Sequence, residues 1–220
     1  AMTVVVSIIL VYTSLNICGN LVLYFFRFDV GNEGAYSIFA AVAFAAQVLV
    51  MMVIPLLRKR FSKSQLFISG FIIQIAGFAV ILIMAFAKLY TPQSWYILCL
   101  PGILIYLGYG MLNVIMTIFL SDSVDYGEVM NGTREESVIF SMQTFTVKLA
   151  SGVAVFLAGL IVDWIHLDTS ATVQTQDTLD ALRMWMTIPS VILLIVGIFV
   201  FKRFYKLDDA RMEEIKSKLN

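Results

Sequence analysis

Lys148 is the residue of this sequence with the clearest chemical potential, because it is the single charge within the apolar stretch Ser137–Val162. It lies about ten residues into that stretch, which at about 1.5 Å per helical residue is about 15 Å deep, near the middle of a hydrocarbon layer about 30 Å thick. A charge at that depth costs about 2.5–3.5 kcal/mol. We expect a partner from outside the chain, or a water-filled cavity, to compensate for this cost.

Lys148 belongs to a row of polar side chains spaced as on one face of a helix: Ser137, Ser141, Thr144, Lys148 and Ser151. Two further rows have the same spacing, one of Tyr106, Gly110, Asn113, Thr117 and Ser121, the other of Thr13, Asn16, Asn20 and Tyr24. Small and polar residues also pack helices together in membranes, and one row alone would favour that explanation. Polar groups facing lipid are costly, so three rows, one centred on a lysine, favour a polar central cavity.

The elements that must position these rows are stretches long enough to cross a membrane. Hydrophobic residues make up 60% of the chain and charged residues only 14%, against about 25% in soluble domains. The apolar stretches are Thr3–Phe26, Ala35–Leu57, Gln65–Ala87, Trp95–Leu120, Ser137–Val162 and Met184–Phe201, and Lys148 is the only charge inside them. The sequence therefore predicts an all-α, multi-pass membrane protein with six transmembrane helices.

The segments between these stretches predict the rest of the organisation. Two connections are long, the acidic segment 121–136 and the polar segment 163–183, and both are expected to be loops. Gly70 and Gly77 are expected to let helices approach closely, and Gln74 is expected to form a packing hydrogen bond. Residues 1–206 then form one six-helix bundle, and residues 207–220 form an amphipathic cytoplasmic tail.

Lysine and arginine predict the orientation of the bundle. The loops after the second and fourth stretches, together with the tail, carry eleven of them, and the opposite loops carry Arg27, Lys88 and Arg183. The positive-inside rule then places both termini in the cytoplasm, in the cell (inner or plasma) membrane. Because the membrane accounts for the basic clusters, and net charge is zero, nothing indicates a nucleic-acid partner.

The sequence contains no pattern typical of a disulfide-rich protein, a metal site or an enzyme. Cys18 and Cys99 are too far apart in the sequence to indicate a disulfide framework or a metal site. There is no glycine-rich phosphate loop, no paired catalytic carboxylates and no zinc-ligand spacing. We therefore expect no enzymatic activity, no cofactor and no metal site within this chain.

Acidic residues crowd the segment that follows the fourth stretch: Asp122, Asp125, Glu128, Glu135 and Glu136, with Arg134 among them. The charge pattern alone favours a solvated loop, in which exposed ion pairs contribute about 0–1 kcal/mol each. The order of the residues is more specific. Read from Asp122, D-S-V-D-Y-G-E-V-M-N-G-T-R-E-E-S and the helix that follows closely resemble the region of helices ten and eleven in the glycoside–pentoside–hexuronide:cation symporters. Tyr24-Phe25-Phe26 with Gly31-Asn32, and Tyr205-Lys206-Leu207-Asp208, resemble the end of helix seven and the C-terminal helix of that family.

The resemblance implies that this chain is the C-terminal half of a twelve-helix transporter of the major facilitator type. The implied partner is the N-terminal six-helix half, whose acidic residues bind most of the coupling cation, sodium or proton. Lys148 occupies the position of a family lysine near those acids, and Thr144 resembles a position beside the sugar. Asn113 stands where a well-known member has a cavity-facing tryptophan, which argues against an identical sugar-stacking arrangement. Asp122 and Arg134 resemble an ion pair that helps to close the cytoplasmic gate, to which Asp125, Glu128 and Glu136 contribute charge.

The function that follows is cation-coupled symport of a sugar, glycoside or hexuronide by alternating access, with this chain supplying half of the central cavity. Its candidate residues are Lys148, Thr144, Ser141, Ser151, Asn113, Tyr106, Thr117, Asn16 and Asn20. Two alternatives stay open. One is a non-transporting six-helix subunit that binds another membrane protein through its polar face, and the other is a transporter of a lipid-like cargo.

Overall fold

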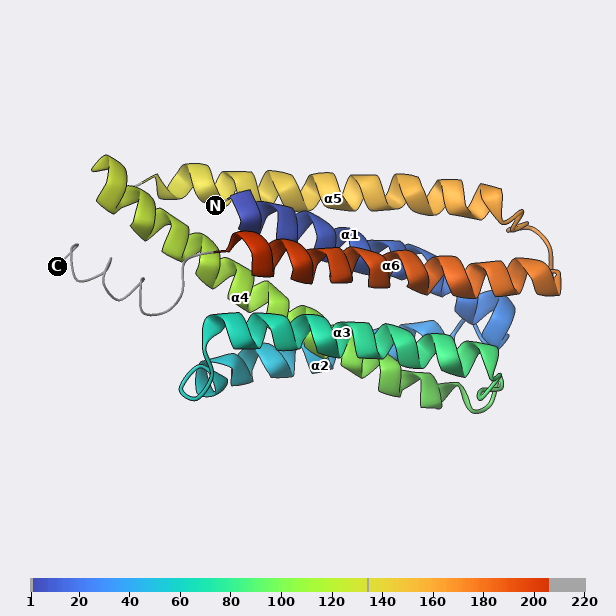
Figure 1. Ribbon diagram of the computed structural model, residues 1–220. Coiled ribbons are helices and arrows are strands. Elements are labelled where there is room, and N and C mark those ends of the chain that lie inside the picture. Colours follow the sequence, from blue (N-terminus) through green and yellow to red (C-terminus); the bar gives the residue numbers. More distant parts are fainter. Residues whose placement is uncertain (1, 134, 206–220) are drawn as a thin grey trace.

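The computed structural model describes residues 2–133 and 135–205 (Figure 1). Six α-helices account for most of them: α1 (Met2–Tyr24), α2 (Ala35–Leu57), α3 (Lys63–Phe86), α4 (Cys99–Asn131), α5 (Glu136–Trp164) and α6 (Gln176–Phe204). Two short turns adjoin them, the π-helical η1 (Phe25–Val30) and the 3-10 helix η2 (Trp95–Leu98). All six helices, two of them with these turns, are long and apolar enough to cross a membrane, so the prediction of six membrane-length helices is confirmed. The predicted tail, 207–220, lies outside the described residues.

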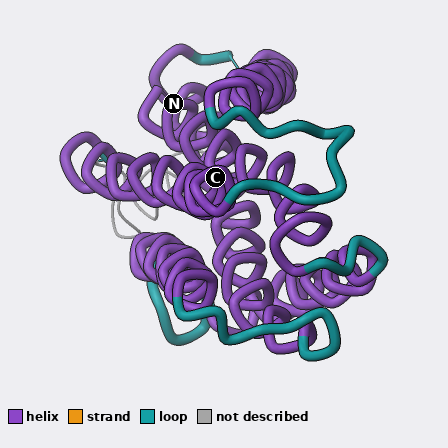
Figure 2. The backbone as a smooth tube through the Cα atoms, turned by 90° about the vertical axis from the view of Figure 1, so that its right-hand side faces the viewer, coloured by secondary structure: helices purple, strands orange, loops and turns teal. Residues whose placement is uncertain are grey.

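The helices form a bundle in which α4 packs on α2 and α3, while α1 packs on α5 and α6. The contact between α3 and α6 joins these two groups, and α5 lies at the edge of the bundle (Figures 1 and 2). We name the two ends of the bundle by a buried acid at each. The Asp122 end holds the start of α3 and the last turns of α4, and the Asp29 end holds η1 and the start of α6.

Close backbone approach and aromatic packing hold α3 against its neighbours. A Cβ atom added to Gly77 would lie 2.7 Å from the Ile105 backbone nitrogen of α4, so a larger residue does not fit there. Near the Asp122 end, Phe67 packs against Phe119 of α4 and Phe201 of α6 at ring-centroid distances of 5.2 and 4.5 Å. The expectation that the glycines of α3 let helices approach closely is therefore confirmed.

Two of the predicted loops are shorter than expected. Helix α4 continues to Asn131 and ends at Gly132, whose left-handed φ of 71° caps the helix. The connection to α5 is therefore 132–135 instead of 121–136. At the other end, the Thr175 hydroxyl accepts a hydrogen bond from the Thr178 amide and starts α6, which leaves 165–175 as the loop instead of 163–183. Hydrophilic segments next to the apolar stretches are thus helical.

Candidate functional site

Helix α5 packs on the bundle through a narrow row of mostly small side chains and leaves most of its surface open. The buried row is Thr146, Ala150, Ala154, Ala158 and Ile161. Of the six membrane-length helices described, α5 is the least buried. The polar row predicted from the sequence lies outside this contact: Ser137, Ser141, Thr144 and Lys148 are exposed, and Ser151 is half-buried.

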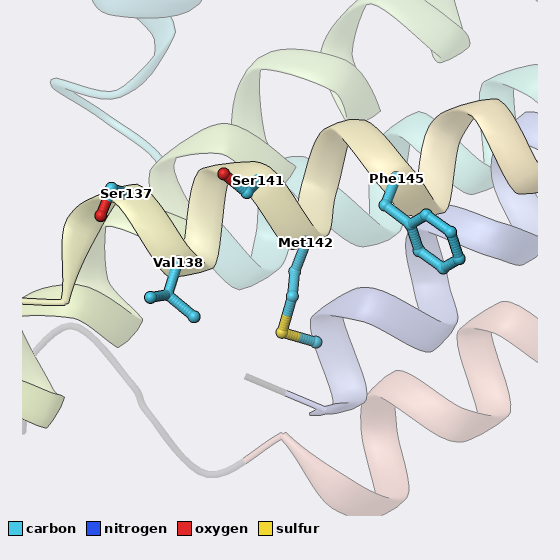
Figure 3. Close-up of a pocket in the computed structure, with 5 residues that line it drawn as sticks. All are labelled: Ser137, Val138, Ser141, Met142 and Phe145. Carbon is cyan, nitrogen blue, oxygen red and sulfur yellow. The ribbon is translucent and has the colours of Figure 1, made fainter.

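The exposed part of this polar row lines an open groove of about 630 Å³. The described residues around it are Ser137, Phe140, Ser141, Thr144, Phe145 and Lys148. A neighbouring hollow of about 440 Å³ is lined by Ser137, Val138, Ser141, Met142 and Phe145 (Figure 3). In Figure 3 the side chains of Val138, Met142 and Phe145 point to one side of α5, and Ser141 points away from them. The described lining of both hollows comes from α5 alone, so a polar row and an apolar row lie side by side on one open helix.

Lys148, near the middle of α5, forms no hydrogen bond or ion pair with any residue in 2–133 or 135–205. Its side chain is exposed on the groove. A lysine inside a membrane normally pairs with an acid or faces water. Among the described residues, the polar side chains that share the groove with Lys148 are the hydroxyls of Ser137, Ser141 and Thr144.

Four of the other candidate residues donate hydrogen bonds back to their own helix. Asn16 donates to the Tyr12 carbonyl oxygen and Asn20 to the Asn16 carbonyl oxygen, each at 2.7 Å. Thr117 and Thr144 likewise donate to the carbonyl oxygens four residues before them, at 3.1 and 3.0 Å. Each of these bonds uses one hydrogen of the side chain. The oxygen atoms of these side chains can still accept hydrogen bonds from other partners.

Asn113 behaves differently, because its amide donates to the Tyr12 hydroxyl of α1 at 2.8 Å. The Tyr12 ring packs edge-to-face on Tyr109 with 5.5 Å between centroids, and Tyr109 packs on Tyr106 at 6.4 Å. Tyr12 and Tyr109 were not predicted as site residues. Tyr109 follows the spacing of the Tyr106–Asn113 row, and Tyr12 lies four residues before Asn16 of the α1 row, so helical spacing could have found both.

The structure therefore gathers the candidates in two places. Ser141, Thr144 and Lys148 share the groove on α5, while Tyr106 and Asn113 lie on α4 at its seam with α1. Helices α4 and α5 contact each other little, so the described residues do not join the two sets. Gly110, predicted in the α4 row, instead faces α2, where an added Cβ would lie 2.6 Å from Val50.

At the Asp122 end, Asp122 of α4 forms a buried ion pair with Lys63 in the first turn of α3. The predicted partner of Asp122, Arg134, lies outside the described residues, so that pairing stays a prediction. Asp125 and Glu128 lie further along α4, and Glu136 begins α5, so these charges are on helices instead of in a loop. Sequence reasoning used Lys63 only for orientation. The capping box formed by Ser62 and Gln65 is the sequence signal that could have placed Lys63 in the first turn of a helix.

At the Asp29 end, Arg183 of α6 holds Asp29 of η1 through two hydrogen bonds, from Nε to Oδ2 at 2.9 Å and from Nη2 to Oδ1. Its Nη1 donates to Asp180 at 2.6 Å, and the Tyr90 hydroxyl donates to Asp29. Burial, together with the Asp29 carboxylate, raises the pKa of the Tyr90 phenol above its ordinary value. Lys148 is the only charge within the six apolar stretches, but the helices extend past those stretches, and α6 also includes Arg183.

Gln74 of α3 also differs from its prediction. Its side chain is fully buried, and neither its amide nitrogen nor its oxygen has a hydrogen-bond partner among the described residues. Helix α4 passes close to it at Gly108, where an added Cβ would lie 2.7 Å from the Gln74 Cβ. The close helix contact leaves the amide without a packing hydrogen bond.

Comparison with known proteins places these features in a family. Residues 1–209 match the family described as MFS/sugar transport protein. The chain is 26% identical over its whole length to the uncharacterized symporter YjmB of Bacillus subtilis (strain 168), covering 46% of that protein. It is 23% identical to the raffinose carrier protein of Pediococcus pentosaceus, with 93% of this chain and 31% of the relative covered. It is 26% identical to the isoprimeverose transporter of Lactiplantibacillus pentosus, with 84% of this chain and 37% of the relative covered.

The chain thus spans less than half the length of these curated relatives. The family match covers nearly the whole chain, including both ion pairs, the groove on α5 and the acidic motif at the end of α4. The chain belongs to the MFS/sugar transport protein family, a family of multi-pass membrane transporters and not of enzymes, in agreement with its resemblance to the glycoside–pentoside–hexuronide:cation symporters.

Proposed function

We propose that this chain forms the C-terminal half of a twelve-helix symporter that couples uptake of a sugar, glycoside or hexuronide to sodium or protons. The observation that carries the proposal is Lys148, a charge in the middle of a membrane-length helix, exposed on an open groove without a described partner. An N-terminal six-helix half would supply the opposite wall of the cavity and the acids that pair with Lys148. The lengths of the relatives and their names, a raffinose carrier and an isoprimeverose transporter, support this reading.

The orientation is part of the same proposal. The distribution of lysine and arginine supports a cytoplasmic position for both termini, with the Asp122 end facing the cytoplasm and the Asp29 end facing outward. The acids on the last turns of α4 and at the start of α5 then lie at the cytoplasmic mouth of the cavity. The Lys63–Asp122 pair ties α3 to α4 at this mouth, which suits a gate that closes when the cavity faces outward.

Coupling in this mechanism is electrostatic. The cation neutralises acids of the other half and so changes how strongly they attract Lys148. If the rearranged state binds sugar better, then sugar must tighten cation binding by the same factor, since the coupling free energy is shared. Ser141 and Thr144, beside Lys148 on the groove, are placed to contact the sugar while this exchange occurs.

Transport by the full-length protein tests the proposal. In liposomes with an imposed sodium or proton gradient, wild type is expected to accumulate a sugar, and Lys148→Ala is expected to abolish accumulation without preventing folding or insertion. Lys59→Ala is the matched control, because Lys59 is exposed on the connection between α2 and α3. Accumulation by Lys148→Ala at the wild-type ratio would overturn the proposed coupling role.

One observation favours a second candidate function. The apolar row of Val138, Met142 and Phe145 beside the serines gives the groove an amphipathic lining, which suits a lipid-like cargo. Exchange of labelled lipid between liposome leaflets, measured on the same preparations, separates this candidate from sugar symport. A non-transporting interaction subunit would move neither cargo.

A further inference from the structure

The hydrogen bond between Asn113 and Tyr12 sets Asn113 apart from the other polar candidates. Asn16, Asn20, Thr117 and Thr144 bond to carbonyl oxygens of their own helices, and such bonds place no constraint between helices. The Asn113 amide instead donates to a hydroxyl on α1, 101 residues away in sequence. This bond fixes the orientation of the Asn113 side chain relative to a second helix.

The Tyr12 ring is itself held in place. It packs edge-to-face on Tyr109, which is buried and lies one turn before Asn113 on α4. The interplanar angle is 75°, in the range that aromatic pairs prefer. Ring packing and the hydrogen bond therefore both hold the Tyr12 hydroxyl beside the Asn113 amide, and groups held in this way lose little conformational entropy when they bind a ligand.

The pair keeps hydrogen-bonding capacity on side chains that are partly exposed. The Tyr12 hydroxyl accepts from Asn113, and the Tyr109 hydroxyl interacts with both residues. As an acceptor in these contacts, the Tyr12 hydroxyl keeps its own hydrogen to donate, and the Asn113 Oδ1 can accept. Both side chains are half-buried. A donor and an acceptor side by side match two adjacent hydroxyl groups of a sugar, since each hydroxyl both donates and accepts.

We propose that Tyr12 and Asn113 together recognise two adjacent hydroxyl groups of the transported sugar, with Tyr12 as the residue that positions the Asn113 amide. The inference rests on the proposed function and adds the part of the sugar that is recognised. Tyr12 acts both by contact with one hydroxyl and through Asn113. Specificity then depends on the presence of both hydroxyls, because a deoxy sugar leaves one of these polar groups without its partner.

The test uses full-length transporter in liposomes and initial rates of uptake for the transported sugar and its monodeoxy analogues. Tyr12→Phe keeps the ring on Tyr109 and removes only the hydroxyl. We expect KM for the parent sugar to rise about five- to tenfold, the effect of one hydrogen bond, with Vmax and the thermal midpoint unchanged. For the monodeoxy analogue that lacks the hydroxyl facing Tyr12, Tyr12→Phe is expected to raise KM less than it does for the parent sugar, since only the effect through Asn113 is left. Tyr12→Phe combined with Asn113→Ala is expected to raise KM further than Asn113→Ala alone, but by less than the product of the two single effects.

Tyr96→Phe is the matched control, because it also removes one phenolic hydroxyl, from an exposed residue of η2. If Tyr12→Phe has the same KM as Tyr96→Phe, the inference is wrong. A fall in Vmax and thermal midpoint with an equal rise in KM for every analogue would also overturn it, since that pattern indicates a merely structural tyrosine. Failure of the wild type to take up any sugar would overturn the proposed function and the inference with it, whereas normal uptake with an unaltered KM in Tyr12→Phe would overturn the inference alone.

Discussion

Arg183 of α6 and Asp29 of η1 form a bidentate ion pair, although they lie 154 residues apart in the sequence. Both side chains are only 3% exposed. Asp180 and Tyr90 complete the hydrogen bonding of the two charged groups. Removal of either partner of such a buried pair is strongly destabilising, because it leaves the other charge buried without its counter-charge.

Asp29→Asn is expected to destabilise the protein, because it leaves the buried Arg183 guanidinium with one carboxylate in place of two. Removal of one partner of a buried pair costs about 3–5 kcal/mol. Thermal unfolding of the full-length protein in detergent would show a lower midpoint. Replacing both partners, Asp29→Leu with Arg183→Met, is expected to recover most of the loss. A double variant as unstable as Asp29→Asn would contradict this account.

Asp122→Asn is expected to loosen the Asp122 end, since it weakens the tie between α4 and Lys63 of α3. The measurement is the rate at which a membrane-impermeant thiol reagent, added from the proposed cytoplasmic side, modifies Thr144→Cys in a cysteine-free background. We expect Thr144→Cys to be modified several-fold faster in the Asp122→Asn variant than in the protein that keeps Asp122. Asp168→Asn, an exposed change in the loop before α6, is the control. Equal rates would mean that the pair stabilises the helices without closing a gate.

Thr144→Cys also reports on the cargo. Because Thr144 lines the groove beside Lys148, a bound sugar is expected to slow its modification by the thiol reagent. Hexosides, pentosides and hexuronides would be compared at saturating concentration, with a cysteine at exposed Thr172 as the control. Protection by at least one sugar supports the symporter. Indifference to every sugar favours the interaction subunit or a lipid-like cargo.

Gln74→Leu is expected to raise the thermal midpoint or leave it unchanged, unlike most substitutions of fully buried residues. The Gln74 amide has no described partner, and a buried polar group without a hydrogen bond costs about 1–3 kcal/mol. Leucine has similar volume and removes that cost. Gly77→Leu in the same helix is the contrasting variant, since it collides with Ile105 and is expected to lower the midpoint. A marked loss of stability in Gln74→Leu would indicate that the amide is bonded to something, such as an internal water molecule.

The sequence predicted the helices well and the charged contacts poorly, for a physical reason. Stretch length and hydropathy decide whether a segment can cross a membrane, and both are local properties. Lys63 and Arg183 were assigned to loops because charge next to an apolar stretch usually marks its end. Each instead lies inside a helix, because a partner from another helix neutralises it. Those partners are 59 and 154 residues away, and no local pattern reveals them.

The same limit applies to the candidate site. The helical spacing of Ser137, Ser141, Thr144 and Lys148 was enough to place them on one face, and the structure has them along one groove. Spacing alone did not show that Gly110 faces α2 or that Asn113 bonds to Tyr12, since both depend on which helix lies opposite. The functional roles of these residues stay predictions that the experiments above decide.

The π-helical turn η1 sets the direction in which Asp29 points. Hydrogen bonds in a π-helix run from residue i to residue i+5, so its turn holds about one residue more than an α-helical turn. If residues 25–30 adopted regular α-helix at unchanged chain length, Asp29 would rotate by as much as about 100° about the axis. Its carboxylate would then point away from Arg183. The ion pair therefore favours the π turn over regular α-helix, and loss of either is expected to weaken the other.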